Sequence, residues 1–225
     1  REDIKTLGVG MDMDALETCG EEIPEYIREA GRKGTAIRLL YIGHLDPGRN
    51  ILFILETMKA ILDMGQEAVL NLVGTGKPEY TKMCWSYAQR EGLMPYIRYA
   101  ERMEQKYLSG LYQASDFFLL PTRYDIFGMV LLEAMYYGLA VLTTHNGGST
   151  MMIRDGENGF CLQLDAVIWA RLIVRLHGDR ARMEQIGRSA HRTVAEGYTW
   201  DVLAPRFLAQ YRQVLDGGGA GPVSG

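Results

Sequence analysis

Two carboxylates lie on either side of a predicted helix start, at a spacing that suits a phosphorylated ligand. Asp125 lies in a loop after a short apolar run, and Glu133 lies inside the next helix, with seven residues between the two acids. The first N–H groups of a helix have no partner within it and favour an anion, and here they belong to residues 127–130. Glu133 could then bind ribose hydroxyls, and Asp125 could accept hydrogen bonds from a sugar beyond the phosphates. A helix-capping acid and a surface glutamate are the plain structural alternatives.

The residues around these acids resemble the sugar-nucleotide-binding motif of the retaining GT-B glycosyltransferases of the group 1, or family 4, type. In that motif two glutamates seven residues apart flank Phe-Gly and precede Glu-Ala-Met, and Asp125 takes the place of the first glutamate. The family pattern continues with a small residue, a glycine, an apolar strand and a Gly-Gly turn, which match Tyr137, Gly138, Ala140–Leu142 and Gly147-Gly148. The resemblance covers roughly residues 7–215 and implies the C-terminal, donor-binding domain of such an enzyme.

The resemblance implies a role for each matched residue. In relatives the first acid contacts the donor sugar, the second acid contacts the ribose, and backbone amides and basic residues hold the pyrophosphate while the glycosidic bond breaks. The catalytic residues implied in this way are Asp125, Arg49 and His44. The donor-binding residues implied in this way are Glu133, Phe127, Gly128, Met129, Val130, Gly74, Gly76, Arg102, Met103, Gly147 and Gly148.

Three positions depart from the family pattern. Asp125 is shorter than the usual glutamate, His44 replaces a permanently charged arginine, and Met151 stands where a glutamate often follows the Gly-Gly pair. The glycine pairs at 74 and 76 and at 147 and 148 also suit simple turns, and the first of them lacks the Ser or Thr of a P-loop. These departures keep a second function open, a non-catalytic nucleotide-binding or scaffold module with a degenerate site.

Strand-like apolar runs alternate with helical patterns along the chain, which predicts an α/β fold with a doubly wound, Rossmann-like parallel sheet. Such a sheet is one half of a GT-B fold. The expected strands are Ile37–Ile42, Ala68–Val73, Tyr96–Ala100, Asp116–Leu120 and Ala140–Thr143. The expected helices are Asn50–Met64, Glu79–Glu91, Glu104–Ala114 and Gly128–Tyr137, followed by C-terminal helices at Asp165–His177, Asp179–Glu196 and Trp200–Asp216.

Composition excludes several classes of protein. The 225 residues carry a net charge of −4, which argues against a nucleic-acid-binding surface. The three cysteines have no metal-ligand spacing and favour reduced thiols, so we expect a cytoplasmic protein without disulfides. No apolar run reaches the roughly 18 residues of a membrane span, which leaves peripheral association with the inner face of a membrane open.

The motifs predict three segments. Residues 1–36 form an interdomain linker and lead-in, residues 37–216 form the nucleotide-sugar (donor) binding domain, and residues 217–225 form a glycine-rich tail. The resemblance implies an N-terminal acceptor domain that this chain lacks. We therefore expect the isolated chain to bind its donor without efficient transfer.

For the intact protein, the resemblance implies an enzyme, a glycosyltransferase that moves a hexose from a nucleoside diphosphate sugar to an acceptor hydroxyl with retention at the anomeric carbon. No metal or other cofactor is expected, because Arg49, His44 and the helix start can stabilise the leaving diphosphate. Asp12-Met13-Asp14 has the spelling of a metal-binding Asp-x-Asp, but it lies far in sequence from the phosphate loops. A nucleotide-sugar epimerase of related fold matches the motif less well.

Overall fold

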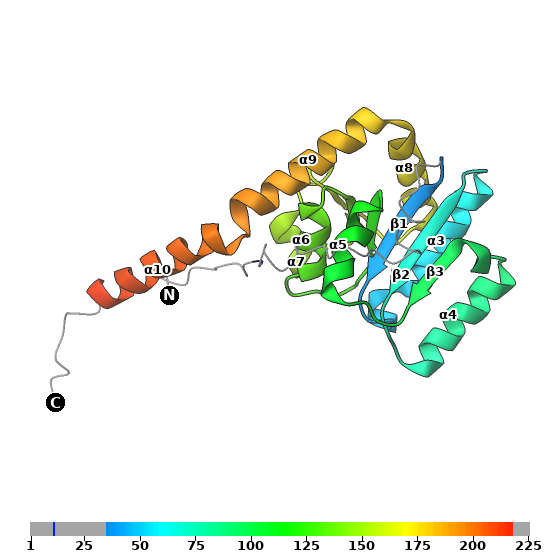
Figure 1. Cartoon of the computed structure of the whole chain (residues 1–225), viewed down its shortest axis with the longest axis horizontal. Coiled ribbons are helices and arrows are strands. Elements are labelled where there is room, and N and C mark those ends of the chain that lie inside the picture. The colour runs from blue at the N-terminus through cyan, green and yellow to red at the C-terminus, as the bar shows by residue number, and fades with distance from the viewer. Residues whose placement is uncertain (1–10, 12–34, 218–225) are drawn as a thin grey trace.

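A computed structural model describes residue 11 and residues 35–217 of the chain (Figure 1). A six-stranded parallel sheet forms the centre, in the order β3-β2-β1-β4-β5-β6. The strands are β1 (Ile37–Ile42), β2 (Ala68–Val73), β3 (Ile97–Ala100), β4 (Phe117–Leu120), β5 (Ala140–Thr143) and β6 (Phe160–Cys161). The prediction of a doubly wound, Rossmann-like α/β fold is confirmed.

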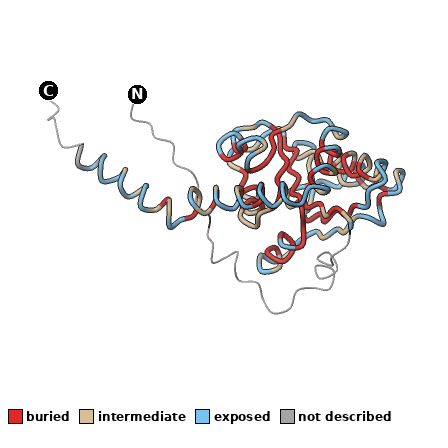
Figure 2. The backbone as a smooth tube through the Cα atoms, turned by 90° about the horizontal axis from the view of Figure 1, so that it is seen from above, coloured by how far each residue is buried: buried red, intermediate tan, exposed pale blue. Residues whose placement is uncertain are grey.

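Helices cover both faces of this sheet. One layer contains α3 (Ile51–Asp63), α4 (Pro78–Arg90) and α8 (Ala166–Gly178), which contact one another through α3. The other contains α5 (Gln105–Gln113), α6 (Met129–Tyr136) and α9 (Arg180–Gly197), and α6 packs against α9. Strands β4 and β5 are buried throughout, as expected for strands that are covered on both faces. Figure 2 shows this buried centre and the mostly exposed helix that follows α9.

The sequence-based elements hold within one or two residues at most boundaries, with two omissions. Residues 147 and 148 do not form a turn but begin a short helix, α7 (Gly147–Met152), whose N-terminus has a capping box between Asn146 and Ser149. The two-residue strand β6 was not predicted, because a run this short carries no periodicity. Tyr96 ends a 3-10 turn, η2 (Met94–Tyr96), rather than starting β3.

A buried carboxylate joins the two central strands to the second helical layer. Asp116, 5% exposed, lies just before β4 and accepts hydrogen bonds from Arg38 Nε at 2.9 Å and Nη2 at 2.8 Å. Arg38 N donates to Asp116 Oδ2 at 3.1 Å, and Arg180, at the start of α9, donates to Oδ1 at 3.1 Å. Burial alone would raise the pKa of the Asp116 carboxyl, but the hydrogen bonds and charge of Arg38, with the bond from Arg180, outweigh it and lower that pKa.

The last helix, α10 (Trp200–Gly217), extends away from the body of the domain (Figure 1). Its inner end is attached by Leu203, which is 4% exposed. Further along, α10 carries large apolar side chains on its surface, namely Leu208, Tyr211 and Leu215, each more than half exposed. Of the predicted linker, only Met11, Thr35 and Ala36 belong to the described residues, and the Asp12-Met13-Asp14 run and the tail beyond residue 217 lie outside them.

Candidate functional site

The predicted site residues gather at the carboxyl ends of β1 and β4, the two strands at which the sheet order reverses. The loop after β1 leads to α3 on one face, and the loop after β4 leads to α6 on the other. In an open α/β sheet a ligand binds at this switch point, because the two loops diverge there and leave the strand ends accessible. The topology therefore places Arg49 and Asp125 on neighbouring loops.

The loop after β1 has a fixed shape. Asp46 caps a 3-10 turn, η1 (Pro47–Arg49), by accepting hydrogen bonds from Gly48 N at 2.8 Å and Arg49 N at 3.1 Å. Asn50 follows with a left-handed backbone, φ 54°, and its Nδ2 donates to Pro121 O at 2.9 Å. These bonds hold the backbone of Arg49 against the loop after β4.

Arg49 and Asp125 form an ion pair across the two loops. Arg49 Nη1 lies 2.6 Å from Asp125 Oδ2, and Nη1 also donates to Thr122 Oγ1 at 3.4 Å. The Arg49 side chain is 31% exposed and that of Asp125 12%. Burial would lower the pKa of the Arg49 guanidinium, but the hydrogen bond and charge of Asp125 raise it overall. Arg49 is therefore cationic at any physiological pH, and a ligand can still reach it.

The start of α6 presents unpaired donors beside this ion pair. Gly128 precedes the helix with φ 73°, a left-handed conformation that favours glycine, and no side chain caps the helix. Phe127 N donates to Asp125 Oδ1 at 3.2 Å, whereas the N–H groups of Gly128, Met129 and Val130 have no acceptor in the described part of the chain. Three free N–H groups at a helix N-terminus favour a phosphate.

Glu133 lies one turn into α6 and is held by a tyrosine from α5. Tyr112 Oη donates to Glu133 Oε2 at 2.7 Å, and the Tyr112 side chain is fully buried and stacks on Tyr137. Burial raises the pKa of the Glu133 carboxyl, and the Tyr112 hydrogen bond offsets only part of this rise. A partly buried carboxylate with one fixed oxygen suits recognition of a hydroxyl pair.

Close packing of backbone against backbone requires glycine at several of the predicted donor-binding positions, which the sequence did not reveal. A Cβ on Gly74 would lie 1.8 Å from Gly43 O, and one on Gly76 would lie 1.8 Å from Leu45 O, because the loops after β1 and β2 pack backbone to backbone. A Cβ on Gly148 would lie 2.8 Å from the backbone of Phe127, whereas Gly147 meets Asp125 O at 3.3 Å. These glycines shape the loops around Arg49 and Phe127, whatever contact they also make with a ligand.

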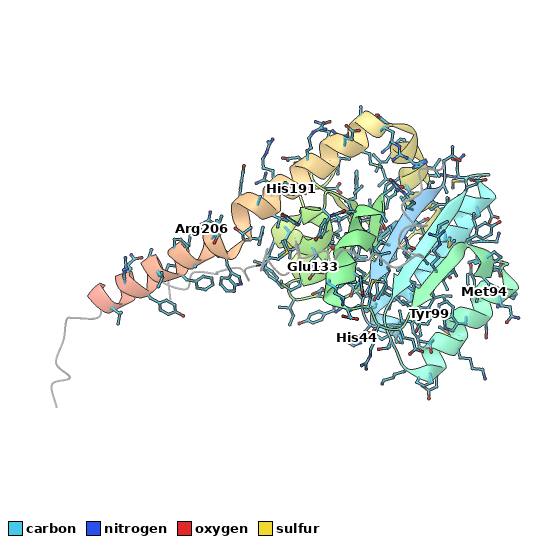
Figure 3. The ribbon with its side chains drawn as sticks, in the orientation of Figure 1. His44, Met94, Tyr99, Glu133, His191 and Arg206 are labelled. Atoms are coloured by element: carbon cyan, nitrogen blue, oxygen red, sulfur yellow. The ribbon has the colours of Figure 1, made fainter. Side chains whose placement is uncertain are left out.

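The other predicted residues lie around the same edge of the sheet. Figure 3 shows His44 at the end of the sheet toward which the strands run, and its ring is exposed while its backbone oxygen accepts from Tyr41 Oη at 2.7 Å. Arg102 is exposed after β3, and the half-buried Met103 lines a cavity beside β2 and β3. The structure thus groups Arg49, Asp125 and the start of α6 tightly, with His44 and Met103 farther out along the strand ends.

Sequence reasoning missed several residues that position the site. Tyr112 was not identified because its partner, Glu133, lies 21 residues away on another helix. Thr122, 1% exposed, contacts Arg49 and also donates to Tyr124 O at 2.9 Å. The Asp46-Pro47-Gly48 turn signal was visible in the sequence, and it could have indicated that the Arg49 loop is rigid.

Two searches of the described residues bear on the remaining expectations. No cluster of three or more His, Cys, Asp or Glu side chains in residues 35–217 is arranged as a metal site. None of the helices in that part of the chain has the length and apolar character to cross a bilayer.

Comparisons with known proteins show what this chain and its fold are similar to. D-inositol 3-phosphate glycosyltransferase from Streptomyces avermitilis is 29% identical over 187 residues, which are 78% of this chain and 39% of that protein. Anabaena Alr3699/HepE in complex with UDP and glucose superposes with a TM-score of 0.80 at 18% identity, over 92% of this chain and 56% of that one. The C-terminal domain of a group 1 glycosyl transferase from Francisella tularensis, LpcC, superposes with a TM-score of 0.72 at 19% identity, over 84% of this chain and 99% of that domain.

The matches also differ in how much of each relative they cover. It spans about half or less of the length of the curated relatives it matches, but nearly all of an isolated C-terminal domain. The model of the family described as glycosyl transferases group 1 matches residues 22–193, more than half of the chain. The resemblance stated from the motif is confirmed, and the chain belongs to the group 1 glycosyl transferases.

Proposed function

We propose that this chain is the donor-binding half of a glycosyltransferase that moves a hexose from a nucleoside diphosphate sugar to an acceptor hydroxyl, with retention at the anomeric carbon. The observation that carries the proposal is the grouping of Arg49, Asp125, Glu133 and three free N–H groups of α6 at one edge of the sheet. Each group suits a different part of a nucleotide sugar.

The diphosphate fits between Arg49 and the start of α6. The unpaired N–H groups of Gly128, Met129 and Val130 can donate to phosphate oxygens, and Arg49 can bind them with a planar, permanently charged fork. Negative charge grows on the diphosphate as the glycosidic bond breaks, so fixed donors at that position stabilise the departing group. His44, exposed at the same edge, can add a hydrogen bond. Because these donors already supply positive charge, we propose transfer that does not require a divalent ion.

The ribose fits beside Glu133. Tyr112 occupies one oxygen of the Glu133 carboxylate, which fixes the rotamer and leaves the second oxygen to accept from a ribose hydroxyl. The distance along α6 suits this arrangement, because Glu133 lies about one turn beyond the free N–H groups that bind the phosphates. The base would continue from the ribose toward Met103 and the ends of β2 and β3.

The donor sugar fits beside Asp125. Its carboxylate receives Arg49 on one oxygen and Phe127 N on the other, and a carboxylate has about four acceptor sites, so it can also accept from a sugar hydroxyl. This position places the sugar on the far side of the diphosphate from Glu133. We propose same-face attack by the acceptor, assisted by the leaving phosphate, as the route to retention.

The acceptor would be supplied from a second domain. The chain covers about half the length of its relatives, and the exposed apolar side chains of α10 need a covering surface in a stable protein. Leu208, Tyr211 and Leu215 lie on one face of that helix at intervals of three and four residues. We propose that this face packs against an acceptor-binding half, which completes the enzyme.

A non-catalytic nucleotide-binding module is a second candidate. It is favoured by the ion pair itself, because Arg49 and Asp125 neutralise each other before any ligand binds. Such a module would bind the nucleotide without distinguishing the attached sugar. The affinity for a sugar conjugate relative to that for the bare nucleotide should therefore separate the two functions.

Thermal unfolding of the 225-residue chain tests the proposal directly. A nucleotide present at 100 times its Kd adds about 2.7 kcal/mol of stability, which raises the Tm of a domain of this size by roughly 5–10 °C. We expect one of UDP, GDP, ADP and CDP to give the largest rise, and one of its sugar conjugates to increase it further. A rise that is equal for a nucleotide and all its conjugates would favour the non-catalytic module, and no rise from any of them would refute a donor site in this chain.

A further inference from the structure

A cavity beside the expected base position is not used by the contacts described above. It measures about 380 Å³ and lies on the face of β2 and β3 that α5 covers in part. Its lining consists of Asn71, Val73, Arg98, Tyr99, Ala100, Met103 and Leu111. A volume of this order holds a small planar ring with room to spare, and most of the lining is apolar.

Two polar side chains of this lining lack partners. Asn71 is 3% exposed, and its Nδ2 forms no hydrogen bond in the described part of the chain. Arg98 pairs with Asn71 in the register of β2 and β3, so the two side chains project from the same face of the sheet. The guanidinium of Arg98 likewise forms no ion pair or hydrogen bond with the described residues.

An unpaired buried amide is costly, so its presence points to a ligand. Leaving a buried donor without a partner forfeits a hydrogen bond that water would otherwise supply. A leucine would fill the same position on a central strand at no such cost. A ligand that presents acceptor atoms to Asn71 and Arg98, and a flat apolar surface to Val73 and Leu111, would satisfy every group in the cavity.

The position of the cavity identifies the ligand. Val73 and Ala100 are the last residues of β2 and β3, and the loop that follows β3 brings Met103 to the cavity. Leu111 lines the cavity from α5, and the next residue on that helix, Tyr112, holds Glu133. A nucleotide whose ribose binds Glu133 would therefore extend its base along α5 toward Asn71.

We propose that Asn71 and Arg98 recognise carbonyl acceptors of the donor's base, so that this chain selects uracil or guanine over adenine. Uracil and guanine carry carbonyl oxygens on the edge that faces away from the ribose, whereas adenine presents an amino group there. Asn71 can rotate its amide to accept from that amino group, but Arg98 has only donors and cannot. Arg98 therefore opposes the adenine amino group with donors of its own, which disfavours adenine in the cavity. This selectivity rests on the proposed function of the chain as the donor-binding half.

Calorimetric titration of the 225-residue chain and two variants tests this assignment. Asn71→Leu and Arg98→Met should each weaken binding of the preferred nucleotide, UDP or GDP, by about 5- to 10-fold, the value of one hydrogen bond. ADP should lose at most one weak contact in Asn71→Leu, and it should bind equally well or more tightly in Arg98→Met, because that variant removes the donor that opposes the adenine amino group. Binding of inorganic pyrophosphate should stay unchanged in both variants, since pyrophosphate uses neither side chain. Arg171→Met, which removes an exposed arginine from α8 in the opposite layer, is the matched control and should change no affinity.

A second measurement separates ligand recognition from a structural role. Asn71→Leu removes an unpaired buried donor, so it should raise the Tm of the ligand-free chain by about 2–4 °C while it weakens nucleotide binding. A structural asparagine would instead lower the Tm when replaced.

Each other outcome identifies what has failed. Wild-type preference for ADP, or the same base preference in both variants as in wild type, overturns the assignment of Asn71 and Arg98 and leaves the donor site intact. Weaker pyrophosphate binding in Arg98→Met would mean that Arg98 attracts anions by its charge alone. That result would also overturn the assignment of Asn71 and Arg98 to the base. No binding of any nucleotide refutes the proposed function, and this assignment with it.

Discussion

Arg49 Nη1 lies 2.6 Å from Asp125 Oδ2, so the cation expected to hold the diphosphate and the acid expected to hold the sugar are partners of each other. The pair joins the loop after β1 to the loop after β4, across the point where the sheet order reverses. A bound donor must therefore share Arg49 with Asp125 or displace it. The energy of binding depends on both residues together.

Replacement of Asp125 by alanine should separate recognition of the sugar from recognition of the nucleotide. Without the carboxylate, Arg49 is free for phosphate and one negative charge is removed from the site, so bare nucleoside diphosphate should bind equally well or more tightly. The sugar conjugate loses a charged hydrogen bond, which is worth about 1.5–3 kcal/mol, so its affinity relative to the bare nucleotide should fall about 10- to 100-fold. Titration calorimetry with both ligands measures this ratio, and an unchanged ratio would remove Asp125 from the sugar site.

Arg49→Gln should weaken every nucleoside diphosphate by a similar factor, whatever base it carries. The lost charge-assisted bond predicts a drop of about 10- to 100-fold, with a weaker dependence of affinity on salt concentration. Arg123→Gln is a matched control, because this exposed arginine is on the adjacent loop and only its backbone N–H contacts Gly48. Equal losses in the two variants would mean that general charge, rather than Arg49 itself, attracts the ligand.

The sequence predicted the sheet well, because buried parallel strands are continuous apolar runs that glycine and proline interrupt. It predicted the helix at residue 147 poorly, since two adjacent glycines favour a turn and only the Asn146 to Ser149 capping box shows that a helix begins there. The glycine requirement at Gly148 comes from the backbone of Phe127, which lies 21 positions earlier in the chain. Such contacts depend on how two loops pack and leave no local pattern.

The site was predictable as a set of residues but not as a set of contacts. The spacing of Asp125 and Glu133 around Phe-Gly indicated the helix whose N-terminus we propose as the anion site. Nothing in that spacing indicated that Tyr112 would fix Glu133, because that bond depends on α5 and α6 lying side by side on one face of the sheet. The unpaired Asn71 was equally hidden, since a lone polar residue in a strand pattern is usually taken as a surface position.

Glu133→Gln should make stability less dependent on pH. Burial raises the pKa of Glu133 above its unfolded value, so the folded state binds this proton more strongly, and stability falls as pH rises from the unfolded pKa through the folded one. Glutamine avoids this loss. The difference in Tm between Glu133→Gln and wild type should therefore be more favourable to the variant at pH 7 than at pH 4. Nucleotide affinity should nevertheless fall about tenfold, because an amide is a weaker acceptor for ribose.

Tyr112→Phe provides the matched comparison for that variant. It removes the hydrogen bond that lowers the pKa of Glu133, so the same fall in stability should extend to higher pH than in wild type. Thermal unfolding of the three proteins between pH 4 and pH 8 measures the difference. Identical pH profiles for wild type and Tyr112→Phe would show that Tyr112 does not control the Glu133 carboxyl.

Asp116→Asn should destabilise the domain without changing ligand affinity. Its carboxylate is bound by Arg38 and Arg180 at the end of β4 opposite to the proposed nucleotide site. Removing one partner of a buried ion pair costs about 3–5 kcal/mol. Because its pKa is lowered in the folded state, wild-type stability should be complete above the unfolded pKa and should fall as pH drops toward the folded one. Denaturant unfolding at pH 7 and pH 3.5 should therefore show a large gap between the two proteins at pH 7 and a smaller gap at pH 3.5. Asp63→Asn, which breaks only the exposed pair with Lys59, should cost less than about 1 kcal/mol. An equal loss of stability in both variants would mean that the ion pairs of Asp116 do not stabilise the domain more than a surface pair does.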